Sequence, residues 1–353
     1  MPVRAFPTPG HGVQRSRPLR LVGRRLPSAG PRDPRPDWQQ ASPAWIAEAL
    51  DRSQRLPSGG WYVLTASREV TSTPRALRVS GRSLVLWHDG AAIHAAPDVC
   101  PHLGAPLSAG CVRDGRLVCP WHGLALGPTG HGDWQSLPTY DDGVLVWVQL
   151  DDGTPRTATP LLPPRPRVAI DAVIAVDVAC EPRDVIANRL DPWHGVHYHP
   201  SSFASLQVLE QGVDAITVRV AYALIGSLAV EVDARFHCSD PRTIVMTVVA
   251  GEGEGSMVET HATPRAAGLT RVVEATLVTS ERPGFAHAFR AAGLVRRILC
   301  WASHRLWRDD APYAERLYAL RTPGGVCTGA TISDRVTAGT PCERPRSTRR
   351  SAP

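Results

Sequence analysis

The sequence predicts an α+β protein, in which a small all-β domain precedes a domain built on an antiparallel sheet with a long C-terminal helix. Short segments with strand character, bounded by Gly, Asp or Pro, fill residues 60–149. A proline-rich stretch follows at 151–166, and longer strand-like segments then lead into one long helical region. A chain of 353 residues can bury two cores, which agrees with two domains.

The chain divides into five segments. Residues 1–42 are rich in Pro, Arg and Gly without apolar periodicity, and we expect them to be disordered. Residues 43–150 form the predicted first domain, and residues 151–166 are a linker. Residues 167–322 form the second domain, and residues 323–353 return to Gly, Thr, Pro and Arg as a disordered tail.

In the first domain, Pro43–Ser53 is predicted to be a short helix because Trp45, Ile46 and Leu50 fall on one helical face. From Gly60 onward the pattern becomes that of short antiparallel strands joined by hairpins. The strands are expected at Trp61–Thr65, Ala76–Val79, Leu84–His88 and Val144–Gln149.

The second domain is predicted from segments that are rich in Val, Thr and Ile and end at turn residues. A short helical stretch is expected at Arg183–His194, and residues 262–270 are expected to form a hairpin loop. Pro283 begins a helix that extends to about Leu320. The strands are expected at Ala169–Val178, Ile216–Ala223, Ala229–His237, Thr243–Ala250, Ser256–Thr263 and Arg271–Thr279.

Composition narrows the classes of function. The net charge of +6 comes from arginine alone, and no aromatic-interleaved basic patch accompanies it, so nucleic-acid binding is not predicted. A basic surface instead suits an acidic electron donor. No segment approaches the roughly 20 apolar residues of a membrane span, and no export signal is recognisable, so we expect a cytoplasmic protein. The eight cysteines do not show disulfide-like spacing.

The most informative motif is Cys100-Pro-His102, followed after sixteen residues by Cys119-Pro-Trp-His122. Two thiolates and two imidazoles in such turns can hold a [2Fe–2S] cluster, with the cysteines on one iron and the histidines on the other. Neutral imidazoles reduce the negative charge around the cluster and raise its reduction potential. A zinc site is the alternative, although zinc fingers usually group like ligands, whereas each turn here mixes them.

The segment CPHLGAPLSAGCVRDGRLVCPWHGLAL resembles the cluster-binding segment of Rieske proteins. With its flanks, from about Gly59 to about Gln149, it resembles the N-terminal domain of Rieske-type non-haem iron oxygenases. All four ligand positions match, while Leu103 stands where the family often has Arg and Leu124 where it often has an aromatic residue. The resemblance implies a Rieske domain followed by a helix-grip-like catalytic domain, similar to that of ketosteroid-hydroxylase-like members.

A second candidate metal site lies in NRLDPWHGVHYH, which resembles the family motif N-x-x-D-x-x-H-x-x-x-x-H and places Asn188, Asp191, His194 and His199 on it. Two histidines and one carboxylate leave positions on Fe(II) open for O₂ and substrate. His197 could compete for a metal, and His199 is preferred because it matches the motif. A histidine cluster without a metal is the alternative.

The third iron ligand is expected from LWRDDAPYAERLY, which resembles the late acidic segment of the family. Asp310 is the predicted ligand and Asp309 the alternative. These carboxylates could instead simply end a helix before Ala-Pro.

The resemblance gives Asp191 a different role. In the family this carboxylate bridges an iron-binding histidine, here His194, to a cluster histidine of the neighbouring subunit, here His122. A carboxylate that accepts N–H bonds from both rings would orient them and offer an electron path. This implies a ring-shaped homotrimer. The alternative is a turn residue before Pro192.

The resemblance therefore implies an oxygenase component, either a mono- or a dioxygenase, that receives electrons from a flavin reductase, directly or through a ferredoxin. Apolar side chains such as Phe203, Phe236 and Phe285, together with the small second domain, favour a steroid-, terpenoid- or carotenoid-like substrate over an aromatic acid. The alternative is a Rieske electron-transfer protein whose second domain binds lipid without catalysis. Iron content distinguishes the two.

Overall fold

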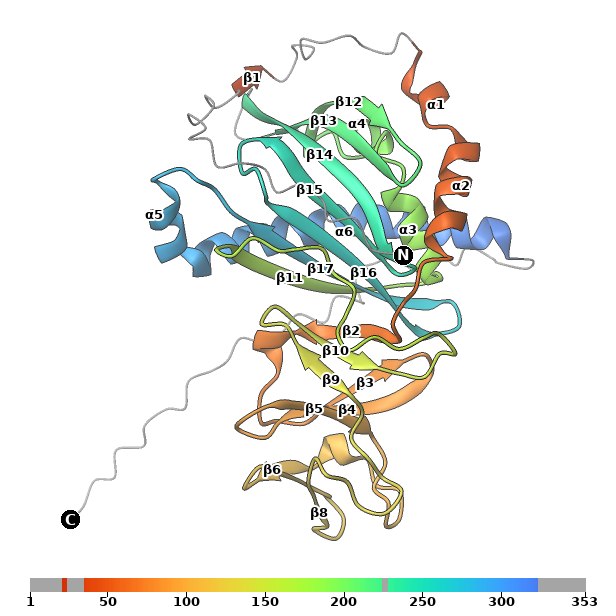
Figure 1. Cartoon of the computed structure of the whole chain (residues 1–353), viewed down its shortest axis with the longest axis vertical. Helices are drawn as coiled ribbons and strands as arrows, with labels where there is room; N and C mark the ends of the chain where they lie inside the picture. Colours follow the sequence, from red (N-terminus) through yellow and green to blue (C-terminus); the bar gives the residue numbers. More distant parts are fainter. Residues whose placement is uncertain (1–20, 24–34, 224–227, 323–353) are drawn as a thin grey trace, which may run out of the picture.

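The chain folds into two regions stacked along the long axis of the molecule (Figure 1). A smaller region of short strands lies at one end, and a larger region contains a broad antiparallel sheet and a long helix. The predicted α+β class is therefore confirmed. In this computed structural model the described residues are 21–23, 35–223 and 228–322.

The N-terminal segment 1–42, expected to be disordered, contains two short elements among the described residues. Leu21–Gly23 forms β1, which pairs antiparallel with β14 (Leu228–Asp240), and Asp37–Gln40 forms helix α1. Such short elements depend on tertiary contacts, which local sequence patterns do not reveal. The rest of that segment up to residue 34, and the predicted tail at 323–353, lie outside the described residues.

Helix α2, Pro43–Ser53, has the predicted bounds. The Ser42 hydroxyl caps it by accepting the backbone N–H of Trp45 at 3.4 Å. Its apolar face packs against Ile186 and Ile244 of the larger region. The first domain therefore begins after α2 and not at residue 43, because periodicity identifies a buried face without identifying what covers it.

The smaller region contains three antiparallel sheets of three strands each, ordered β2-β10-β9, β3-β4-β5 and β6-β7-β8. The sheet of β6, β7 and β8 lies at the tip farthest from the larger region (Figure 1). The four predicted strands are present within two residues of their expected ends. The bounds are β2 Trp61–Ala66, β3 Arg75–Val79, β4 Arg82–His88, β5 Ile93–Pro97, β6 Cys111–Arg113, β7 Arg116–Val118, β8 Ala125–Leu126, β9 Thr139–Asp141 and β10 Leu145–Gln149, with 3-10 helices at Ser67–Glu69 and Leu107–Ala109.

In the larger region one antiparallel sheet has the order β11-β17-β16-β15-β14-β13-β12. β12 was not predicted, because this edge strand is only partly buried and its sequence alternates weakly. The predicted hairpin loop is almost entirely strand, and Gly268, with φ +67°, supports its two-residue turn. The remaining bounds are β11 Ile170–Val178, β12 Phe203–Gln211, β13 Ala215–Ala223, β15 Thr243–Gly251, β16 Met257–Ala266 and β17 Leu269–Val278.

Four helices accompany this sheet: α3 (Pro182–Arg189), α4 (His194–Tyr198), α5 (Phe285–Arg290) and α6 (Ala292–Arg321). The long helix expected from Pro283 is thus two helices that meet at Ala291. Pro312 lies inside α6 without ending it, so Asp309 and Asp310 do not terminate the helix. α6 crosses one face of the sheet (Figure 1). Among the described residues, no helix combines the length and apolar character needed to cross a bilayer.

The two regions share an apolar interface with an ion-pair cluster at its edge. Side chains of β2 and β10 pack against β15, β16 and β17. The expected linker, residues 151–166, contains no helix or strand. Near its end, the Arg165 guanidinium lies 2.6 Å from the Glu259 carboxylate and 2.8 Å from Asp142. Arg165 therefore connects the linker to both regions.

Candidate metal centres and the cavity beside them

Two loops at the tip of the smaller region have the same backbone construction. The N–H of Cys100 donates to the carbonyl of Ala105 at 2.8 Å, and the N–H of Gly104 donates to the Cys100 carbonyl at 2.9 Å. The loop at Cys119 repeats both bonds at 2.9 and 3.1 Å. Gly104 and Gly123 have φ of +80° and +74°, a conformation that favours glycine.

These loops bring the four predicted cluster residues together. Cys100 and Cys119 are buried with their sulfurs in hydrogen-bond contact, and each sulfur accepts backbone N–H bonds from residues two and three positions later. The rings of His102 and His122 lie on the exposed side, 4.9 Å apart between centroids. Paired sulfurs on one side and paired imidazoles on the other fit a cluster that has one ligand type at each iron.

The two thiols differ in acidity. Burial raises the pKa of the Cys100 thiol, and contact with Cys119 adds to that rise. Burial acts in the same direction on Cys119, but the backbone N–H of Trp121 and the Cys100 thiol outweigh it and lower the Cys119 pKa. Backbone N–H donors stabilise thiolates, which are the form that binds iron.

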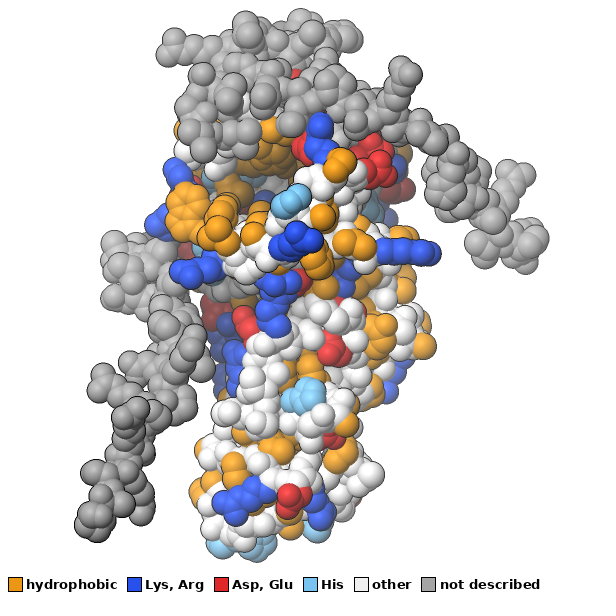
Figure 2. All heavy atoms as spheres, turned by 90° about the vertical axis from the view of Figure 1, so that its left-hand side faces the viewer, with side chains coloured by type: hydrophobic (Ala, Val, Ile, Leu, Met, Phe, Trp, Pro, Cys, Tyr) orange, Lys and Arg blue, Asp and Glu red, His pale blue; other side chains and the backbone are white. Residues whose placement is uncertain are grey.

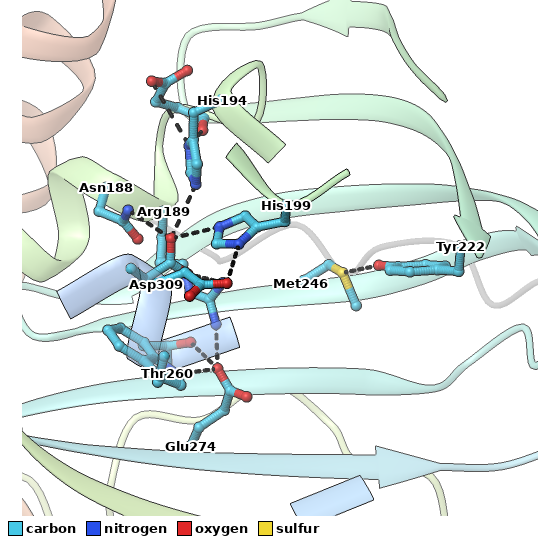
Figure 3. A network of polar contacts seen from close by, with 12 residues as sticks. Asn188, Arg189, His194, His199, Tyr222, Met246, Thr260, Glu274 and Asp309 are labelled. Carbon is cyan, nitrogen blue, oxygen red and sulfur yellow. Dashed lines mark hydrogen bonds and ion pairs between the residues drawn. The ribbon is translucent and has the colours of Figure 1, made fainter. Parts of the chain in front are cut away.

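The second centre joins residues that are far apart in the sequence. His194 begins α4, His199 directly follows it, and Asp310 comes from α6. One ligand atom of each lies within 4.8 Å of the other two. The Nε2 atoms of His194 and His199 lie 3.1 and 2.9 Å from the same Asp310 oxygen. Figure 3 shows the His194 and His199 rings turned toward each other.

The contacts of His194 indicate what this centre can hold. Its Nδ1 contacts the backbone carbonyl of Asp191, and because a carbonyl only accepts, Nδ1 carries a proton and Nε2 is the nitrogen that faces Asp310. Burial acts to raise the pKa of Asp310, but the bonds to His194 and His199 outweigh it and lower that pKa. An ionised carboxylate and two imidazole nitrogens then converge on one point, and these are donor groups that a divalent metal ion binds. The side chains therefore fit a metal ion.

A buried polar network holds the Asp310 carboxylate (Figure 3). The Asn188 side-chain amide donates to it at 3.2 Å, and the Arg189 guanidinium lies 3.7 Å from its other oxygen. Arg189 also pairs with Glu274, which accepts the Trp307 indole N–H at 2.7 Å. Outer contacts of this kind fix the orientation of a metal ligand.

Asp191 lies beside the centre and not in it. One of its oxygens accepts the Tyr313 hydroxyl at 2.9 Å and lies 3.8 Å from His194 Nδ1. Its other oxygen is buried without a hydrogen bond among the described residues. The Tyr313 ring stacks on His194 with 5.1 Å between ring centroids, so Asp191 and Tyr313 together hold that imidazole.

His197 and Asp309, the two alternative metal ligands, lie outside the centre. His197 is exposed, and its Nε2 contacts the Asp37 carboxylate at 2.8 Å. Asp309 is partly exposed and lies 3.5 Å from Nδ1 of His199, on the side of the ring away from Asp310. Neither belongs to the group of converging ligand atoms.

A cavity of about 600 Å³ opens beside the second centre. Phe203 and Phe236 line it as expected, whereas Phe285 does not, because the chain turns away at α5. The Tyr222 hydroxyl donates to the Met246 sulfur at 3.3 Å, and burial raises its pKa to about 12, so it stays a neutral donor. Apolar lining residues include Leu206, Val218, Val220, Ile244, Met246, Met257, Val258, Leu277, Val278 and Leu306.

Sequence reasoning missed Arg189, Glu274 and Tyr313. Glu274 offers the best signal, since it is the single carboxylate of strand β17 and stands between the apolar residues Val273 and Ala275, where an unpaired charge is unfavourable. Arg189 lies inside the recognised histidine motif, but nothing in that motif indicates that it would pair with β17. Tyr313 lies three residues after Asp310, and only helical spacing connects the two.

Comparison with known proteins identifies the smaller region. Residues 60–149 match the sequence profile of the Rieske [2Fe–2S] domain. These residues are a Rieske domain. The match confirms the predicted [2Fe–2S] cofactor, and residues 151–325 match a domain of unknown function (DUF5914).

Two relatives are named as oxygenases. The chain is 29% identical over 177 residues to the vanillate O-demethylase oxygenase subunit of a Pseudomonas species, covering 45% of this chain and 49% of that one. It is 29% identical over 199 residues to 4beta-methylsterol monooxygenase of Methylococcus capsulatus, covering 48% and 53%. The chain thus spans about half the length of these curated relatives.

The fold resembles that of dicamba monooxygenase over about three quarters of the chain. A crystal structure with bound dicamba has a TM-score of 0.57 at 19% identity, covering 74% of this chain and 87% of that one. Another, with non-haem iron and dicamba, has a TM-score of 0.51 at 17% identity, covering 78% and 92%. The Rieske domain and the relatives named as oxygenases confirm the resemblance to Rieske-type non-haem iron oxygenases, and these crystal structures confirm the predicted fold.

Proposed function

We propose that the chain is the oxygenase component of a Rieske non-haem iron system, which inserts oxygen from O₂ into a hydrophobic small molecule. The observation that supports it most directly is the convergence of His194, His199 and Asp310 at the wall of an apolar cavity. These three residues would hold Fe(II). In the Rieske domain the cluster ligands would be Cys100, His102, Cys119 and His122.

The chain's own residues prepare both sites. When bound, the cluster and Fe(II) supply one-electron transfer and O₂ activation. Asp191 and Tyr313 orient His194, and Asn188 with Arg189 orients Asp310. The apolar wall of the cavity keeps water away from the reacting atoms.

Electron transfer between subunits fits this arrangement. Within one chain the Rieske tip and α4 lie in opposite parts of the molecule (Figure 1). Asp191 would bridge His194 to His122 of the partner subunit in a head-to-tail homotrimer. The exposed cluster histidines and the unsatisfied Asp191 oxygen support this. A flavin reductase, directly or through a ferredoxin, would supply electrons in the cytoplasm.

The cavity favours a steroid-, terpenoid- or carotenoid-like substrate. Its wall is largely apolar, and its two arginines are engaged: Arg189 pairs with Glu274, and Arg305 lies over the Trp301 ring at 5.7 Å. The relatives are named for both kinds of substrate, a sterol in one case and vanillate in another, so this preference rests on the cavity wall.

Turnover of lipophilic substrates with a surrogate reductase and ¹⁸O₂ tests the proposal. We expect label in an oxidised product, and loss of that product in His199→Ala while the visible absorption of the cluster is unchanged. His197→Ala is the matched control, because this exposed neighbour contacts Asp37 and should keep turnover. Equal turnover in His199→Ala and wild type would remove His199 from the site.

A further inference from the structure

α5 and the first half of α6 expose an apolar stripe, defined here as Phe289, Leu294, Ile298 and Trp301. Their exposed fractions are 47%, 63%, 56% and 63%. The last three are spaced four and three residues apart, so they lie along one face of α6. Scattered exposed apolar residues are ordinary, but a contiguous group of large ones marks an interaction surface.

The charged side chains that α5 and the first half of α6 place beside the stripe are basic. From Arg282 to Arg308 the chain contains six arginines and no Asp or Glu, and two of the six are paired with acids of other elements, Arg282 with Glu252 and Arg296 with Asp171. Three of these arginines, Arg290, Arg297 and Arg308, are exposed. Figure 2 shows hydrophobic side chains bordered by basic ones on the face that carries α5 and the start of α6. A basic rim around an apolar centre suits a partner whose outer layer is anionic and whose deeper layer is apolar.

The stripe continues into the cavity. Trp301 belongs to both the stripe and the cavity, since its side chain is largely exposed and also contributes to the cavity lining. Leu299 and Ala302, on the adjoining side of the same helix turns, also line the cavity. A lipophilic molecule that leaves a bilayer at the stripe would reach the cavity without crossing bulk water.

We propose that the apolar stripe docks this protein peripherally on an anionic lipid bilayer. Trp301 would lie at the level of the headgroups, where amphipathic rings are favoured, with Leu294 and Ile298 at the acyl boundary. Arg290, Arg297 and Arg308 would contact lipid phosphates. This surface role goes beyond the proposed oxygenase function and does not depend on it.

A second copy of this chain that binds through a two-fold contact is a less suitable occupant, because that contact would place the same stripe, with the same arginines, on both sides. Like charges facing each other across an interface are unfavourable, whereas lipid phosphates neutralise them. A head-to-tail contact would place a different surface opposite the stripe, and the measurement of oligomeric mass below tests it.

Vesicle flotation of the full-length holoprotein tests this inference without requiring turnover. We expect binding to phosphatidylcholine vesicles that contain phosphatidylglycerol, weaker binding to phosphatidylcholine alone, and loss of binding as salt rises. Leu294→Glu with Ile298→Glu should lower the partition coefficient by about 100-fold or more, because apolar burial is lost and like charge is added. Both residues lie outside the cavity lining, so the cluster absorption should be unchanged.

Leu320→Glu is the matched control. Leu320 is 65% exposed near the end of the same helix, outside the stripe, and its substitution should leave binding unchanged. Arg290→Ala with Arg297→Ala should lower binding by about 20-fold and flatten the salt dependence.

Three results would overturn the proposal. One is no flotation with anionic vesicles at low salt, and another is equal binding by wild type and the Leu294→Glu, Ile298→Glu variant, which would place binding on other basic segments. The third is a change of oligomeric mass in that variant, by light scattering, without vesicle binding by the wild type. That result would identify a second copy as the occupant.

Discussion

The loops around Cys100 and Cys119 position their side chains through backbone hydrogen bonds that span at most five residues. The centre around Asp310 instead depends on side chains from α3, α4, α6 and β17. The cluster histidines are exposed, whereas His199 and Asp310 are buried. A locally built, exposed site suits exchange of electrons with partners, and a buried one suits chemistry that must exclude water.

This difference predicts how each site fails. A loop site should lose its metal when one ligand changes, while the remaining fold persists. The buried site should respond to residues that never touch the metal, because its geometry depends on a wider network.

Replacement of a cluster cysteine should have the largest effect. Cys119→Ser removes one of two thiolates, so we expect complete loss of the cluster's visible absorption and of turnover. Cys111→Ser is the control, since Cys111 lies on the neighbouring strand β6 outside the ligand set. A Cys119→Ser protein that keeps its colour would contradict the assignment.

Breaking the ion pair between Arg165 and Glu259, which links the two regions, should have the second-largest effect. Arg165→Met leaves the fully buried Glu259 carboxylate without its cation, which we expect to cost about 3–5 kcal/mol in the free energy of unfolding. Arg156→Met removes an exposed pair with Asp151 and should cost less than about 1 kcal/mol. Urea unfolding measures both, and equal costs would show that Arg165 does not join the regions.

Acid should weaken the same link. Burial would raise the pKa of Glu259, but hydrogen bonds from Arg165 and His261 lower it from 4.5 to about 2. Because the folded pKa is depressed, this stabilisation is present above the unfolded pKa and is lost as pH falls. Between about pH 5 and pH 3 the wild type should lose roughly 2 kcal/mol more stability than Glu259→Gln. Parallel pH profiles in urea unfolding would exclude this role.

Removing a hydrogen bond that helps to hold His194 should have the smallest of these effects. Tyr313→Phe keeps the ring stacked on His194 but removes the hydrogen bond to Asp191, so iron affinity should fall about tenfold. Competition with an iron chelator measures this, while the cluster absorption should be unchanged. Tyr318→Phe, farther along α6 and outside the centre, is the control. Unchanged affinity in Tyr313→Phe would show that Asp191 orients His194 without help.

Much of the fold could be predicted because strand periodicity and turn residues are local signals. β2, β4 and β11 begin and end within two residues of their expected positions. The partner of α2 could not be predicted, since amphipathic spacing does not show which surface covers the helix. For the same reason, apolar residues at helical spacing predicted a long helix here without showing which of its residues are covered, and Leu294 and Ile298 are exposed.

Among the residues of the two candidate centres, those in one short motif could also be predicted, whereas those that meet through tertiary packing could not. Cys100, His102, Cys119 and His122 stand in one short segment whose spacing reveals them. Asp310 was chosen only from a short resemblance, because no local signal shows that α6 would pass beside α4. Arg189 and Glu274 meet through tertiary packing alone, and only a structure brings them together.

Iron content per chain tests most directly whether the polypeptide carries two separate iron centres. Two irons in the cluster and one at His194, His199 and Asp310 predict about three irons per wild-type chain and about two in His199→Ala, with equal cluster absorption in both. About two irons in both proteins would contradict the second centre and favour an electron-transfer role.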